Sequence, residues 1–139
     1  MYVFVIDAIV SHHGRGTIDK VAGIEARGFI LGAAVAYHFG AGFVPMRKAD
    51  KLPSTTYSEE YSLEYGAATI EVHQDAFARG ERVLLVDDVL ATGGTVAAAA
   101  KLVGRAGAVV AGCSVLLELT FLAGRERLVD LDVHALLSY

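Results

Sequence analysis

The strongest constraint on the fold is the stretch VLLVDDVLATGGTVAAAA at residues 83–100. Four apolar side chains are followed by Asp87 and Asp88, by a short turn of small and hydroxylated residues, and then by an alanine-rich segment of helical character. An apolar run of this kind favours a strand that is buried on both faces of a sheet. The chain therefore places two like charges at the end of a buried strand, and this arrangement needs a chemical reason.

Strand-like and helix-like segments alternate along the chain, which predicts a parallel sheet. The predicted fold class is α/β, a doubly wound, mostly parallel sheet flanked by helices, in a single domain over residues 1–139. The expected elements are a helix at 2–13 ended by Gly14 or Gly16, a strand at 19–25, a helix at 28–39 ended by Gly40, a strand at 42–46, a polar loop at 47–62, a strand or hairpin at 63–73, a strand at 82–88, a helix after the turn TGGT, a strand at 108–119 and a last segment at 132–139.

Length and charge narrow the class of partner. A chain of 139 residues is the size of one domain and buries roughly two thirds of its unfolded surface. Its apolar fraction is 54%, but no apolar run approaches the ~20 residues of a membrane span. The net charge is -4 without a basic block, which argues against nucleic acid or a membrane surface as partner. A small-molecule partner is expected.

Cysteine and histidine positions add little chemistry. The single cysteine, Cys113, excludes disulfides within the chain and metal clusters built on cysteine, and its apolar neighbourhood indicates a core residue. The first residues lack the pattern of a secretory signal, so a reducing cytoplasm is the expected location. The histidines show no metal-ligand spacing with partners, and we expect all of them to be structural or exposed: His12, His13, His38, His73 and His134.

The turn after Asp88 has the composition of a phosphate cradle. Parallel sheets of this class bind ligands outside the carboxyl ends of their strands, at the switch point where connections leave on opposite faces. Glycines at 93 and 94 allow backbone N–H groups to face a ligand, and the following helix directs its positive end there. A phosphorylated ribose fits both halves, since Asp87 and Asp88 would then face sugar hydroxyls or a magnesium ion. The alternative is that both aspartates cap an ordinary turn.

At these residues the sequence resembles a known family. VLLVDDVLATGGT is similar to the signature of type I phosphoribosyltransferases, which bind 5-phosphoribosyl-1-diphosphate. The segments GIEARGFILG, FVPMRKADKLP, EEYSLEYG and LAGRERL resemble, in the same order, segments of the adenine phosphoribosyltransferases. The resemblance covers nearly the whole chain from about Asp19 onward. It ranks hypoxanthine, guanine and orotate enzymes below the adenine branch.

The resemblance implies a transfer of phosphoribose to adenine, which gives AMP and diphosphate in purine salvage, with Mg²⁺ as cofactor held mainly through the substrate. It implies that Glu64 is the catalytic acid/base residue and that Tyr61 lies in a mobile loop that covers the site. It also implies a cis peptide at Glu25–Ala26 and a homodimer. The substrate-binding residues that it implies are Ala26, Arg27, Arg47 and Lys51 for the diphosphate, Asp87 and Asp88 for the ribose hydroxyls, and Ala91, Thr92, Gly93, Gly94 and Thr95 for the 5-phosphate.

The chain departs from the family pattern at its start. Relatives usually carry about forty residues before the helix that residues 2–13 match, including a hood segment that packs on the purine. We therefore expect a phosphoribosyltransferase core domain over residues 1–139 without the hood. Two explanations stay open, a truncated start of a working enzyme or a natural short form. The alternative function is a regulatory module that binds a phosphoribosyl ligand or nucleotide without efficient catalysis.

Overall fold

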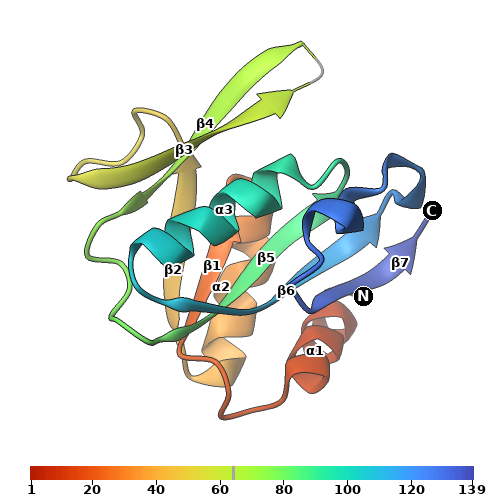
Figure 1. Cartoon of the computed structure of the whole chain (residues 1–139). Coiled ribbons are helices and arrows are strands. Elements are labelled where there is room, and N and C mark those ends of the chain that lie inside the picture. The colour runs from red at the N-terminus through yellow and green to blue at the C-terminus, as the bar shows by residue number, and fades with distance from the viewer. Residues whose placement is uncertain (64) are drawn as a thin grey trace.

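A computed structural model describes residues 1–63 and 65–139. It contains helices on both sides of a sheet (Figure 1). The elements are α1 (Tyr2–His13), β1 (Lys20–Ile24), α2 (Arg27–Phe39), β2 (Gly42–Lys48), β3 (Thr56–Leu63), β4 (Gly66–His73), β5 (Arg82–Leu90), α3 (Gly94–Arg105), β6 (Val109–Glu118), the 3-10 helices η1 (Thr120–Leu122) and η2 (Gly124–Arg127), and β7 (Val133–Ser138).

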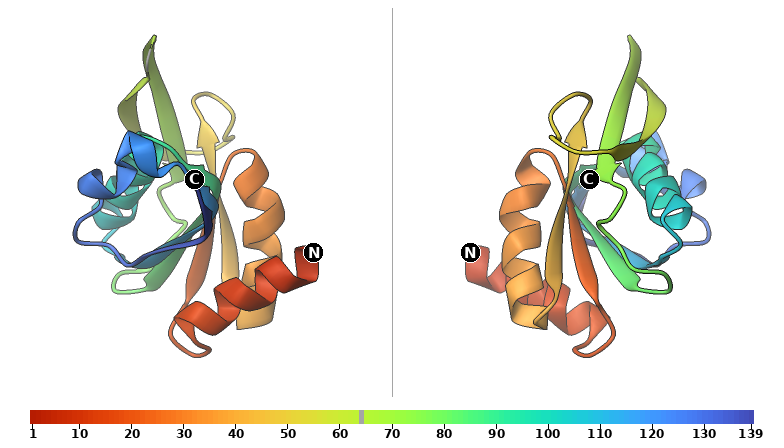
Figure 2. Two further views of the ribbon diagram at one scale, coloured as in Figure 1. Left: turned by 90° about the vertical axis from the view of Figure 1, so that its right-hand side faces the viewer. Right: turned by 90° about the vertical axis from the view of Figure 1, so that its left-hand side faces the viewer.

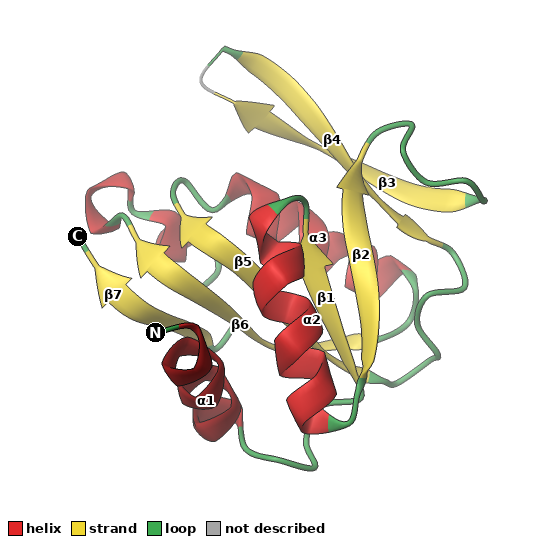
Figure 3. Ribbon diagram, turned by 180° about the vertical axis from the view of Figure 1, so that it is seen from behind, coloured by secondary structure: helices red, strands yellow, loops and turns green. Residues whose placement is uncertain are grey.

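The described residues form one seven-stranded sheet in the order β3-β4-β2-β1-β5-β6-β7. Neighbouring strands are parallel from β2 through β1, β5 and β6 to β7. Strand β4 pairs antiparallel with β2 on one side and with β3 on the other. Helices α1 and α2 cover one face, and α3 covers the other (Figures 2 and 3). The prediction of a doubly wound, mostly parallel α/β sheet is confirmed.

Strand β5 shows why the sheet is buried on both faces. Its successive side chains point to opposite faces, and Val83 to Val86 are all fully buried. Val83 and Leu85 belong to the core under α3, while Leu84 and Val86 belong to the core under α1 and α2. The unbroken apolar run before Asp87 is thus divided between two cores.

The prediction of a polar loop over residues 47–62 is wrong in its second half. Residues Thr56–Leu63 lie in strand β3, which pairs along its length with β4. Its outward side chains are polar, so the composition indicated a loop, but Tyr57 and Tyr61 alternate onto the core under α3. The guanidinium of Arg105 also lies 4.9 Å from the centre of the Tyr57 ring. The hairpin that was the second option for 63–73 therefore begins earlier and joins β3 to β4.

The other elements were predicted well. Helix α1 ends at Gly14, and α2 ends at Gly40 in a left-handed conformation with φ of 67°. Strand β5 continues two residues past Asp88 to Leu90. The short helices η1 and η2 were not predicted, since each spans fewer than five residues. Among the described residues, no helix is long and apolar enough to cross a membrane.

Candidate phosphoribosyl site

The candidate site lies at the carboxyl ends of β1, β2 and β5. Strand β1 pairs with both others, so that Ile24 lies opposite Met46, and Gly23 lies opposite Val86. The chain leaves β1 for α2 on one face of the sheet and leaves β5 for α3 on the other face (Figure 2). Strands β1 and β5 therefore form a switch point, where this class of sheet leaves a crevice for a ligand.

The two aspartates at the end of β5 have different environments. Asp87 is buried, with 9% of its surface exposed, whereas Asp88 is half-buried. The backbone N–H of Asp88 donates to Asp87 Oδ1 at 2.8 Å, and that of Val89 donates to Asp88 Oδ1 at 2.9 Å. Burial, followed by the charge of Asp88, raises the pKa of Asp87 to about 7, although the backbone hydrogen bond opposes the shift.

Arg27 joins this strand end to the neighbouring loop. Its Nε lies 2.7 Å from Asp88 Oδ2, while 79% of its side chain stays exposed. Helix α2 comes close enough for this contact because its second residue is glycine. A Cβ at Gly28 would stand 2.7 Å from the carbonyl oxygen of Val86 and 3.3 Å from Asp87 Oδ1. The guanidinium thus reaches into the crevice from the start of α2.

A second group of charges surrounds Glu25. Its carboxylate pairs with Arg47 at 3.4 Å and with Lys51, and it accepts the backbone N–H of Lys48 at 2.9 Å. Burial raises the pKa of Glu25, but the hydrogen bonds from Lys51 and Lys48 and the nearby positive charges outweigh burial and lower it. Because Glu25 is ionised, it holds both predicted diphosphate cations beside the loop. The peptide bond between Glu25 and Ala26 is cis, as expected.

The predicted phosphate loop follows β5 directly and leads into α3. Gly93 caps the helix with φ of 85°, and the helix begins at Gly94. Residues 89–96 line a small hollow of about 60 Å³. The first N–H groups of a helix have no partner within the helix, and they carry the positive end of its dipole. The structure therefore places Ala91, Thr92, Gly93, Gly94 and Thr95 around one anion-sized hollow.

The segment after β6 supports this loop from behind. A Cβ at Gly93 would stand 2.5 Å from the carbonyl oxygen of Gly124, and a Cβ at Gly124 would stand 2.5 Å from that of Ala91. The segment is anchored by Arg125, whose Nε lies 2.9 Å from both carboxylate oxygens of the buried Glu118. No sequence pattern indicated a role for this part of LAGRERL, since its contact with the phosphate loop arises only in the fold.

A further cation near the loop was also missed. A Cβ at Gly94 would lie 3.5 Å from Arg127 Nη1 and 3.7 Å from the ring of Tyr61. Both residues line a hollow of about 210 Å³ between the β3–β4 hairpin and α3. The guanidinium of Arg127 thus stands beside the positive end of α3, and two positive groups in this arrangement favour an anion between them.

The hairpin also borders a larger hollow of about 520 Å³. Leu63 and Leu122 supply apolar surface to it, and Thr92 and Arg127 connect it to the phosphate loop. Tyr61 lies on strand β3 rather than in a loop, and it packs against α3. The predicted catalytic residue Glu64 lies outside the described residues.

Comparison with known proteins identifies the family of this arrangement. Residues 4–135 match the family described as phosphoribosyl transferase domain. An adenine phosphoribosyltransferase of Salinispora arenicola is 65% identical over 134 residues, which are 96% of this chain and 71% of the relative.

Two solved structures have the same fold. The adenine phosphoribosyltransferase of Rhodothermus marinus is 52% identical and superimposes with a TM-score of 0.95, over 99% of this chain and 78% of that chain. The enzyme of Saccharomyces cerevisiae, solved with adenine and an imino-altritol bisphosphate, is 38% identical with a TM-score of 0.91, over 97% of this chain and 78% of that chain.

Proposed function

The chain belongs to the adenine phosphoribosyltransferase family, and from this premise we propose that it transfers phosphoribose from 5-phosphoribosyl-1-diphosphate to adenine. The products are AMP and diphosphate, and the reaction serves purine salvage. The observation that carries the proposal is the switch point between β1 and β5, where Arg27 and Asp88 lie in contact beside the anion-sized hollow of residues 89–96.

Each part of the donor has a matching part of the site. The hollow at the start of α3 receives the 5-phosphate, because backbone N–H groups and the helix dipole both favour an anion there. Asp87 and Asp88 accept hydrogen bonds from the ribose hydroxyls. Arg27 presents a planar guanidinium to the diphosphate, and Arg47 and Lys51 add charge from the adjacent loop.

The chemistry follows from the bond that breaks. Positive charge develops on the ribose as diphosphate leaves the anomeric carbon, as in the cleavage of other glycosidic bonds. The negative carboxylates of Asp87 and Asp88, at the end of β5, are compatible with this positive charge. The cationic side chains near the diphosphate stabilise it as it leaves. The purine nitrogen attacks the opposite face, and Glu64 handles the proton that the ring loses.

The side chains at the strand end fit a magnesium ion that is held mainly through the substrate. Both carboxylate oxygens of Asp88 already have protein partners, in Arg27 and in the backbone N–H of Val89. Oxygens of the diphosphate would therefore supply most ligands, with Asp87 and Asp88 orienting the ribose and the ion's water shell. When bound, the ion neutralises charge on the diphosphate.

We place the purine in the hollow of about 520 Å³ beside the phosphate loop. A flat aromatic ring needs apolar cover, and Leu63 and Leu122 provide it on this side of the site. Residues that precede the chain in longer relatives would add to this cover, as the expectation of a hood implies.

The test is AMP formation by this chain from adenine, the diphosphate donor and Mg²⁺, together with calorimetric binding of the donor alone. Asp88→Asn is expected to abolish both signals, whereas Asp130→Asn, an exposed aspartate after η2, is expected to retain both. AMP formation with this variant pattern supports the transferase.

Donor binding without AMP formation would support the alternative of a regulatory module, and it would contradict the proposed transferase activity of this chain. Absence of both signals in a folded chain would contradict the phosphate site itself.

A homodimer and a cytoplasmic location are part of the proposal. Support for the dimer comes from apolar side chains that stand exposed at the start of α1 and on β7, namely Val3 at 69%, Phe4 at 71% and Leu137 at 61%. Buried in a second copy, this surface would lose contact with water. Light scattering during size-exclusion chromatography measures the mass, and a monomer at micromolar concentration would refute the dimer.

A further inference from the structure

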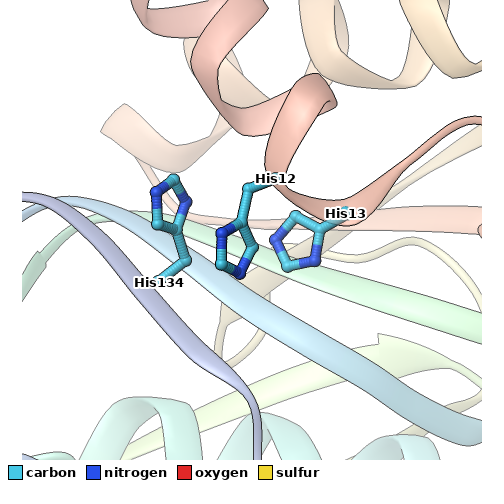
Figure 4. Close-up of side chains that lie close together, drawn as sticks. All are labelled: His12, His13 and His134. Carbon is cyan, nitrogen blue, oxygen red and sulfur yellow. The ribbon is translucent and has the colours of Figure 1, made fainter.

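Three histidines from the two ends of the chain lie together. His12 and His13 end helix α1, and His134 is the second residue of β7 (Figure 4). One ring nitrogen of each lies within 4.8 Å of the others. The rings of His12 and His134 are stacked, with centres 3.9 Å apart and planes at 3°, and His12 meets His13 edge-on at 4.8 Å.

The groups around the cluster resemble the supporting contacts of a metal site. Asp132 Oδ2 lies 3.4 Å from His12 Nε2, and the Ser114 hydroxyl lies 2.6 Å from His13 Nε2 and 3.4 Å from His134 Nδ1. Histidines that bind metals use one ring nitrogen for the ion, and the other is held by a carboxylate, carbonyl or hydroxyl. Asp132 can accept from His12 Nε2, and the Ser114 oxygen can accept from both His13 Nε2 and His134 Nδ1. The other nitrogen of each ring is then left for an ion.

We propose that His12, His13 and His134 form a binding site for a divalent transition ion of the zinc or nickel class, with Asp132 as the carboxylate that orients His12. Imidazole nitrogen is a preferred ligand for these ions, whereas Mg²⁺ prefers oxygen. The site therefore does not compete for the magnesium of the proposed reaction.

An ion can reach the cluster from solvent, and the ring nitrogens lie close enough together to bind one ion after a small rotation of the rings. His12 is 36% exposed at its side chain, while His13 and His134 are half-buried. Ligand nitrogens of tetrahedral zinc stand about 3.3 Å apart, as bonds of about 2.0 Å require. The rings must therefore turn inward, and His12 has room to do so because it faces solvent. A solvent-accessible fourth position would take water.

The environment favours the neutral form of two imidazoles, those of His13 and His134, and metal binding requires neutral rings. Burial, followed by the charge of His12, lowers the pKa of His13 to about 4. Burial and His12 also lower the pKa of His134, against the opposing effect of Asp132. The neutral rings of His13 and His134 leave lone pairs available for an ion.

The site is separate from the phosphoribosyl site. His134 is in register with Ser114 of β6, and Ser114 is in register with Val86 of β5, so His134 lies two strands away from the residue before Asp87. Its ring packs against α1, on the face of the sheet opposite α3 and the phosphate loop. An ion here would join the end of α1 to the last strand of the sheet. Its expected effect is on stability rather than on turnover, because a ligand that binds only the folded chain stabilises it.

The experiment uses the chain without a polyhistidine tag, stripped with a chelator and then titrated with Zn²⁺ by calorimetry. We expect one saturable site per chain and a rise in melting temperature. Co²⁺ serves as a spectroscopic probe, because tetrahedral coordination gives it strong visible absorption. His12→Gln and His134→Gln are expected to abolish the site and the absorption, and Asp132→Asn to weaken binding by roughly 10- to 100-fold.

The matched control is His38→Gln, an exposed histidine on α2 outside the cluster, which should bind as the unaltered chain does. Circular dichroism checks that each variant is folded. The proposal is overturned if the unaltered chain shows no one-to-one binding. It is also overturned if His12→Gln and His134→Gln both bind normally, or if His38→Gln loses as much affinity as they do.

Discussion

Arg27 Nε and Asp88 Oδ2 lie 2.7 Å apart, across the crevice between the β1–α2 loop and the end of β5. This ion pair holds in place, before any ligand arrives, the guanidinium proposed for the diphosphate and a carboxylate proposed for the ribose. Since 79% of the Arg27 side chain is exposed, the pair contributes little to stability. Its importance is that the arginine can exchange Asp88 for phosphate oxygens without crossing the site.

Arg27→Ala is therefore expected to lower kcat/KM for the diphosphate donor by about 10- to 100-fold, the size of a lost charge-assisted hydrogen bond of 1.5–3 kcal/mol. The melting temperature should barely change. Steady-state kinetics with varied donor, together with calorimetry, measures both. Arg27→Lys should restore part of the loss, because it keeps the charge but not the fork. An unchanged kcat/KM in Arg27→Ala would remove Arg27 from the site.

Gly93→Ala is expected to destroy the phosphate loop. The residue has φ of 85°, and its Cβ would stand 2.5 Å from the carbonyl oxygen of Gly124. Gly80→Ala is a matched control, with φ of 80° but no atom within 4 Å of its Cβ. Left-handed strain of about 1–2 kcal/mol should lower the melting temperature of both variants. Donor binding should vanish only in Gly93→Ala, and equal donor affinities would refute the clash.

Arg127→Gln tests the cation beside the start of α3, for which no sequence pattern indicated a role. Its Nη1 would lie 3.5 Å from a Cβ at Gly94, at the start of α3. An anion bound there would therefore interact with the guanidinium of Arg127 and with the positive end of the α3 dipole. We expect the donor affinity to fall about tenfold. Arg79→Gln, an exposed arginine in the loop before β5, should leave the affinity unchanged. If the two variants behave alike, Arg127 does not contact the donor.

Glu64→Gln tests the acid/base assignment that rests on the resemblance. The variant should lose roughly 10²- to 10⁴-fold in turnover, as expected for removal of a general acid or base, and it should bind the donor normally. Asp75→Asn, an exposed aspartate after β4, is the control and should retain its rate. Single-turnover AMP formation separates chemistry from binding, and a full rate in Glu64→Gln would transfer the role elsewhere.

Local patterns were sufficient to predict most of the fold. The buried run before Asp87 and the glycines after it predicted a strand, a turn and a helix, because short-range backbone preferences determine each of them. Strand β3 was missed for the opposite reason. Its order depends on pairing with β4 and on the contact of Tyr57 and Tyr61 with α3, and neither is encoded in its polar composition.

The site shows the same division. Asp87, Asp88 and the phosphate loop are contiguous in sequence, so their proximity could be predicted. The contact of Gly124 with Gly93 and the position of Arg127 arise from a segment about thirty residues away along the chain. The histidine cluster joins residues 12 and 134, and its neighbours are set by the packing of α1 on the edge of the sheet. Spacing rules do not detect ligands separated by most of the chain.

The buried carboxyl of Asp87 predicts a pH dependence of stability. Its pKa is raised from 3.8 to about 7 by burial first and then by Asp88. Between these values the folded chain binds the proton that the unfolded chain has lost. The stabilising contribution is therefore complete below pH 3.8 and is lost as the pH rises through about 7. His13, with its pKa lowered to about 4, contributes in the opposite sense, so stability is lost as the pH falls below 6.5 toward 4.

Asp87→Asn separates the two effects, because both chains contain His13. An asparagine cannot ionise, and its Oδ1 can still accept the N–H of Asp88. Relative to the unaltered chain, the variant should therefore gain stability as the pH rises from 5 to about 7 and little beyond, by at most about 2.7 kcal/mol, since each pH unit contributes about 1.4 kcal/mol. Thermal unfolding across this range measures the difference, with Asp130→Asn as the exposed control. A difference that stays constant with pH would mean that Asp87 ionises normally in the folded chain, and the buried carboxyl would then have to be neutralised by a partner.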